Sequence, residues 1–187
     1  MPTISVRRAS AADRPMVEHL WLMFRHDMSE FGGQLPNPDG TFRAERLVAA
    51  FEDQDWAGYV FATAGDRPVG FAIVRGLAGP VRVLSSFFVV RSMRRARVGL
   101  QAVRAVVAEY PGPWEVAFQE ANVAATRFWR RVATELAGRD WTEERRAVRG
   151  RPDLPPDTWV SFTVGGPAPA GYDSSIGATP GGTKPNT

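Results

Sequence analysis

A group of four arginines between residues 91 and 97 is the first part of the sequence that suggests chemistry. It follows the apolar run VLSSFFVV at 83–90 and precedes the helix-like segment LQAVRAVVAEY at 100–110. A loop that joins a strand to a helix directs backbone N–H groups at an anion, and the arginine guanidinium pairs well with phosphate. Three interpretations follow: a solvated charge cluster, a nucleic-acid contact and a phosphate-binding loop.

The motifs that accompany common nucleotide and nucleic-acid sites are absent from the sequence. There is no GxxxxGK[ST] and no GxGxxG, so a nucleoside-triphosphate or dinucleotide site is not expected. No helix-turn-helix, zinc-finger or RNP pattern is present, and a formal net charge of +3 is too small to argue for DNA binding. The arginines therefore belong either to a charge cluster or to a loop for another phosphate-containing ligand.

Two other segments carry side chains that could move protons. His26 and Glu30 fall on one face of a predicted helix, and histidine titrates near neutral pH. The alternative is an exposed helix edge. Glu115 and Gln119 share one face of a predicted strand, where ordinary alternation of polar and apolar residues is the alternative.

The hydrophobic periodicity predicts the element order β-α-α-β-β-β-α-β-α-β-β. The predicted strands are 3–9, 58–64, 68–76, 81–90, 114–122, 141–148 and 158–164. The predicted helices are 10–30, 42–53, 99–110 and 123–137.

Composition narrows the class of protein. Hydrophobic residues make up 44% of the 187 residues, enough for one core, and we expect one domain over 1–164. Residues 165–187 are rich in Gly, Pro, Ser and Thr, which predicts a disordered tail. No apolar run is long enough to span a bilayer, and no signal peptide is recognised, so we expect a cytoplasmic protein. There are no cysteines, and no metal site is expected.

Two motifs and the element order together resemble the GNAT acyltransferase superfamily. Its loop pattern [Q/R]-x-x-G-x-[G/A] aligns with residues 94–99, where Arg94 and Gly99 match and Arg97 replaces the central glycine. The pattern N-x-x-A-x-x-F is matched by Asn122, Ala125 and Phe128. The strings WEVAFQEANVAATRFWRRV and HDMSEF are similar to a bacterial subgroup of predicted acetyltransferases.

The resemblance implies an α/β GNAT fold, with a mixed, mostly antiparallel sheet that splays between the fourth and fifth strands and is flanked by helices. It implies that the pantetheine of acyl-CoA or of acyl-phosphopantetheine enters that gap, while the 94–99 loop holds phosphate. The residues expected to bind this co-substrate are Val89, Val90, Arg94, Arg95, Ala96, Arg97, Val98, Gly99, Asn122, Phe128 and Trp129.

The sequence departs from the family where acid-base groups are expected. Ser85 and Ser86 stand where many members carry a carboxylate, and Trp129 stands where many carry a tyrosine. A neutral amine that attacks directly needs little base, and positioning then supplies most of the acceleration. The candidate catalytic residues are His26, Glu30, Ser86 and Glu115, and the candidate substrate residue is Gln119.

We therefore expect a GNAT-type N-acyltransferase, similar to N-acetyltransferases, that acylates an amine of a small molecule in a ternary complex. A basic rim at the loop also fits an acyl carrier protein as donor, and an aminoacyl-tRNA donor fits the charge. The non-enzymatic alternative is a degenerate domain that binds acyl-CoA or a protein partner. The sequence sets neither the acceptor nor the oligomeric state.

Overall fold

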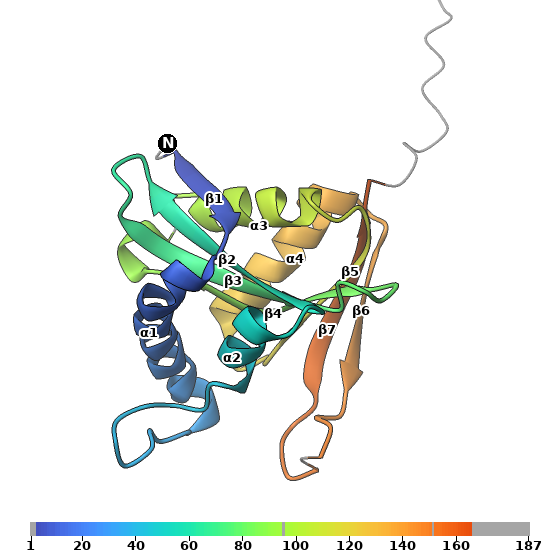
Figure 1. Ribbon diagram of the computed structural model, residues 1–187. Helices are drawn as coiled ribbons and strands as arrows, with labels where there is room; N and C mark the ends of the chain where they lie inside the picture. Colours follow the sequence, from blue (N-terminus) through green and yellow to red (C-terminus); the bar gives the residue numbers. More distant parts are fainter. Residues whose placement is uncertain (1–2, 95, 151, 166–187) are drawn as a thin grey trace, which may run out of the picture.

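The chain forms one seven-stranded sheet in the computed structural model, which describes residues 3–94, 96–150 and 152–165 (Figure 1). The strand order is β1-β2-β3-β4-β5-β7-β6, and every neighbouring pair is antiparallel except β4 and β5. The strands are β1 (Ile4–Arg8), β2 (Trp56–Thr63), β3 (Pro68–Arg75), β4 (Arg82–Val89), β5 (Gly112–Phe118), β6 (Trp141–Arg146) and β7 (Asp157–Val164).

Two helices cover each face of the sheet. Figure 1 shows α1 and α2 in front of the strands and α3 and α4 behind them. Short 3-10 turns at Ala11–Asp13 and Arg91–Met93 precede α1 and follow β4. The helices are α1 (Arg14–Gly32), α2 (Glu45–Glu52), α3 (Val98–Ala108) and α4 (Val123–Ala137).

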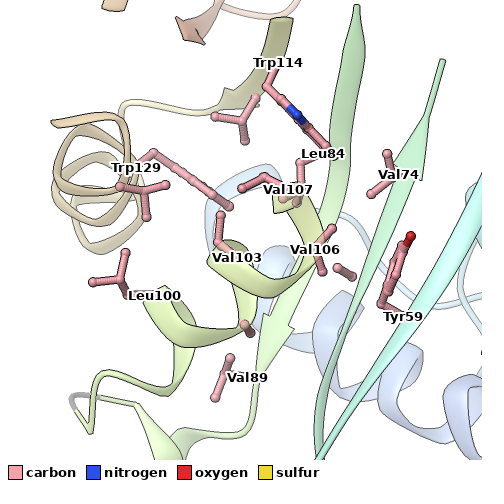
Figure 2. Packing of buried hydrophobic residues seen from close by; sticks show 14 of the residues in the cluster. Tyr59, Val74, Leu84, Val89, Leu100, Val103, Val106, Val107, Trp114 and Trp129 are labelled. Atoms are coloured by element: carbon pink, nitrogen blue, oxygen red, sulfur yellow. The ribbon is translucent and has the colours of Figure 1, made fainter. Parts of the chain in front are cut away.

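The larger part of the core lies between the sheet and α3 with α4. Figure 2 shows Val103, Val106 and Val107 of α3 facing apolar side chains of the strands. Trp114 of β5 is 1% exposed, and its indole N–H donates to the Tyr110 carbonyl at 2.9 Å. The buried hydrophobic area supplies most of the stability of this layer.

The smaller part of the core lies under α1 and α2. Trp21 and Phe24 of α1 pack on Phe71 of β3, with ring centroids 6.0 and 5.7 Å away from it. Leu47 of α2 joins the same cluster. The central strands are therefore buried on both faces, which explains the nearly continuous apolar sequence of β2 and β3.

The parallel strands β4 and β5 pair over only three residues, 82–84 of β4 with 114–116 of β5. A bulge interrupts β4 next to this point, because Leu84 pairs with Val74 and Ser86 with Ile73, which leaves Ser85 as the extra residue. Beyond Leu84 the two strands share no further ladder pair. The predicted splay between the fourth and fifth strands is confirmed.

The predicted element order is confirmed, but several boundaries differ. The fifth strand ends at Phe118, not at residue 122, because the chain turns there and the Asn122 N–H donates to the Gln119 carbonyl at 2.9 Å. Gln119 thus lies beyond the strand and does not share its face with Glu115. The second strand starts at Trp56, and the predicted helix 42–53 is shortened to 45–52. The predicted disordered tail lies outside the described residues, apart from Gly165.

Candidate functional site

The loop between β4 and α3 keeps a glycine-like backbone at the position of the family's central glycine. Arg97 immediately precedes α3 and has φ 59° and ψ 6°, in the left-handed region. That region costs a non-glycine residue about 1 kcal/mol. The first amides of α3 have no partner within the helix, as at every helix start. A loop of this shape, followed by free amides, suits a phosphate group.

Gly99 allows α3 and α4 to approach each other closely. A Cβ at Gly99 would lie 3.0 Å from a ring carbon of Phe128, which is tighter than ordinary contact. Phe128 stacks on Phe87 of β4 with ring centroids 5.6 Å apart, and Trp129 packs edge-on against both. Trp129 is only 6% exposed and belongs to the core. The aromatic cluster therefore connects α4 to the part of β4 that has left β5.

Two of the loop arginines are held by a carboxylate of α1. Arg91 and Arg94 both donate to Asp27, Arg91 at 2.7 Å. Burial raises the pKa of Asp27, but the hydrogen bonds from Arg94 and Arg91 outweigh it and leave the pKa below its usual value. Arg94 also donates from Nε to the Val89 carbonyl at 2.8 Å. Asp27 was missed by sequence reasoning, although it lies within the HDMSEF string.

The other predicted co-substrate residues have structural partners as well. The Asn122 side chain caps α4, accepting from the Ala125 N–H at 3.0 Å. The Val90 N–H donates to Val69, and its carbonyl accepts from Met93. Ala96 is half-buried against the core, and Val98 is fully buried at the start of α3. Arg95 lies outside the described residues.

The predicted catalytic residues do not come together in one constellation. His26 and Glu30 lie on the exposed face of α1. Ser86 is 4% exposed, and its hydroxyl has no hydrogen-bond partner among the described residues. Gln119 is half-buried, and its Oε1 likewise has no such partner. Ser86 pairs with Ile73, and so faces the α1 and α2 side of the sheet.

Glu115 lies on that same face and is held by an arginine of β6. Arg146 donates to both carboxylate oxygens, at 3.0 and 2.7 Å, and the Ser161 hydroxyl donates at 3.2 Å. The Arg146 hydrogen bonds lower the pKa of Glu115 despite its partial burial. The Arg146 guanidinium also lies 4.7 Å from the ring centroid of Trp159. Both oxygens of Glu115 are thus occupied.

Three further charged side chains approach the splay from this side. Arg46 of α2 donates from Nη1 to the carbonyl of Ser85, the bulge residue, at 2.6 Å. Arg75 of β3 pairs with Val83. Val83 immediately precedes Leu84, which is the last residue of β4 that pairs with β5. Burial raises the pKa of Asp157, and the charge of Arg46 opposes that rise. Sequence reasoning missed all three, because residues 46, 75 and 157 are far apart in the chain and match no motif.

The described part of the chain contains neither a candidate metal site nor a candidate membrane span. No group of three or more His, Asp or Glu side chains there could hold a metal ion. No helix there is both long and apolar enough to cross a membrane.

The splayed parallel strands, the loop that opens α3 and the flanking helices define a GNAT fold. The sequence model described as the acetyltransferase (GNAT) family matches residues 18–133, and the chain belongs to that family. No curated protein sequence matches it.

Solved structures share this fold at low sequence identity. An acetyltransferase of the GNAT family from Staphylococcus aureus is 13% identical, with a TM-score of 0.61 over 87% of this chain and 99% of that chain. The ribosomal-protein-S18-alanine N-acetyltransferase from Escherichia coli is 12% identical, with a TM-score of 0.60 over 91% and 100%. An aminoglycoside acetyltransferase from an uncultured soil metagenomic sample is 14% identical, with a TM-score of 0.55 over 78% and 93%.

Proposed function

We propose that the protein is an N-acyltransferase that moves an acyl group from a pantetheine thioester to the amine of a small molecule. The observation that carries the proposal is the early separation of β4 and β5, which share pairs only over 82–84 and 114–116. Beyond that point the β5-facing edge of β4 has no strand partner. Arg46 and Arg94 bind the carbonyls of Ser85 and Val89 in this part of β4. The remaining backbone groups of that edge suit an extended arm that binds as an added strand would.

The loop at 94–99 supports acyl-CoA as the donor. The left-handed backbone of Arg97 preserves the course that glycine would give, so the amides that follow can approach a pyrophosphate. An acyl carrier protein is the second candidate donor, favoured by the exposed Arg91 and Arg97. Asp27 neutralises part of that charge, which favours free acyl-CoA. An aminoacyl-tRNA donor draws its support from charge alone.

The proposed reaction is a direct attack in a ternary complex. The neutral amine nitrogen forms a bond to the thioester carbonyl carbon, the carbon–sulfur bond breaks, and the thiolate leaves with the electron pair. The proton lost by nitrogen passes to water and the thiolate is protonated from water. Glu115 is bound on both oxygens, so its part in this reaction is to hold Arg146 rather than to accept the proton.

The test combines acetyl-CoA with a panel of small amines and follows release of the free thiol. We expect amine-dependent release, together with the mass of an acetylated product. A matched titration of acetyl-CoA by calorimetry separates the alternatives. Binding without thiol release across the panel, with acetyl-CoA and with an acetylated carrier protein, would support the degenerate, non-catalytic domain. Absence of both binding and release would reject the proposal.

A further inference from the structure

Arg46 and Arg75 carry charge that the fold leaves without an ion-pair partner among the described residues. Arg46 is bonded to the Ser85 carbonyl, which is neutral. Arg75 is half-buried at the end of β3, and its side chain makes no hydrogen bond to any described residue. Other described arginines, such as Arg25 and Arg82, also lack an ion pair, so what distinguishes Arg46 and Arg75 is their position beside the splay.

The electrostatic surroundings of Arg46 favour a bound anion. Arg46 is solvent-exposed as a residue. Desolvation by neighbouring protein atoms nevertheless lowers the pKa of its guanidinium, and the positive charges of Arg75 and Arg25 lower it further. Asp157 acts in the opposite direction but does not contact Arg46 as an ion pair. Cations that repel one another in a partly desolvated site are stabilised when an anion binds between them.

Both arginines lie beside the splay. Arg75 pairs with Val83, and Val83 pairs with Glu115, so Arg75 belongs to the row next to the last one that crosses from β3 to β5. Arg46 contacts the bulge at Ser85, where β4 leaves β5. Glu115, the carboxylate of that row, is already bound to Arg146. Glu115 therefore acts on Arg75 only through space, and the Arg75 guanidinium has no described carboxylate in contact with it.

We propose that Arg46 and Arg75 form an anion subsite, and that the acyl acceptor is an amine that carries a carboxylate, such as an amino acid. The inference rests on the proposed acyl transfer and specifies its substrate class. The two guanidinium groups would bind the carboxylate by charge-assisted hydrogen bonds. The carboxylate would then anchor the acceptor on the α1 and α2 side, with its amine directed at the splay.

Equilibrium binding tests the subsite without turnover. Wild type would be screened by thermal shift against N-acetyl amino acids and their carboxamides, and the best pair would be titrated by calorimetry. We expect at least one acid to bind more tightly than its amide. Arg75→Gln should weaken the binding of that acid about 10- to 100-fold and leave the binding of the amide unchanged. Arg75 suits this test because its side chain makes no hydrogen bond or ion pair with another described residue, although its charge lowers the pKa of Glu115.

Two further variants control the result. Arg43→Gln removes an exposed arginine next to α2 that is already paired with Glu45, and acid binding should be unchanged. Arg46→Lys keeps the charge and should retain part of the preference, whereas Arg46→Gln should lose it. Circular dichroism shows whether loss of the Ser85 contact has changed the fold. The subsite is rejected if no acid is preferred over its amide, or if the preference survives in Arg75→Gln.

The thiol-release assay keeps this proposal distinct from the proposed function. Transfer to amines with no preference for a carboxylate would leave the acyltransferase standing and overturn the subsite. Carboxylate binding that depends on Arg75, with no thiol release from either thioester donor, would leave the subsite standing and overturn the acyltransferase.

Discussion

The sheet face under α3 and α4 and the face under α1 and α2 differ most over β5 and β7. On the first face Trp114, Val116 and Phe162 are buried in the main core. On the second, the alternate residue Glu115 accepts hydrogen bonds from Arg146 of β6 and from the Ser161 hydroxyl. One face of the same strands therefore holds the fold together, while the other carries charge beside the splay. The two-residue period of a strand separates the core face from the charged face, which is the face that we propose for acceptor binding.

Two tryptophans on opposite faces give the largest expected difference. Trp114→Ala should lower the free energy of unfolding by about 3–5 kcal/mol, because it opens a cavity and removes an indole hydrogen bond. Trp159→Ala should cost about 1–2 kcal/mol, since that ring is half-buried and mainly supports Arg146. Urea unfolding followed by circular dichroism measures both. Equal losses would contradict the division between the faces.

Glu115→Gln tests whether the charged face also contributes to stability. At pH 7 we expect a loss of about 1–2 kcal/mol, because charge-assisted hydrogen bonds to Arg146 are lost, while solvent around the exposed Arg146 weakens the pair. The folded pKa of Glu115 lies below the ordinary 4.5. Its stabilisation is therefore complete above that pH and disappears as the pH falls through the folded pKa.

The measurement is urea unfolding of both proteins at pH 7 and near pH 3, where their difference should shrink. Glu120→Gln is the control, since it removes an exposed carboxylate paired with Arg145 and should change stability by less than about 0.5 kcal/mol. Unchanged stability in Glu115→Gln together with lost thiol release would instead assign Glu115 a catalytic role.

The same two faces show what the sequence could predict. The splay and the α3 loop were expected from the family resemblance, which could be recognised because motif residues such as Arg94, Gly99 and Asn122 lie within short segments. The Arg46 and Arg75 pair did not, because α2 and β3 meet only in the folded sheet. Asp27 was missed for the same reason: its partners are 64 and 67 residues away. Glu115 was placed on the right face, but its arginine partner comes from another strand.

Arg97→Gly has the smallest expected effect on stability, and it tests the loop at 94–99 that we propose binds the acyl donor. The left-handed conformation of Arg97 is costly for an arginine and free for glycine. The substitution should therefore raise the free energy of unfolding by about 0.5–1 kcal/mol. Asp66→Gly is a matched control, because Asp66 is the other non-glycine residue with positive φ in the described chain, at 55°. It should give a similar gain, measured by urea unfolding.

The two variants should differ in donor binding. If the Arg97 side chain obstructs the loop, Arg97→Gly should tighten the binding of free coenzyme A, whereas Asp66→Gly should leave that binding unchanged. If Arg97 instead contacts the acidic surface of a carrier protein, Arg97→Gly should weaken that donor and make its affinity less sensitive to salt. Calorimetric titration of both variants with both donors decides between these outcomes. Failure of either donor to bind wild type or Arg97→Gly would reject the phosphate-binding loop and return these arginines to a solvated charge cluster.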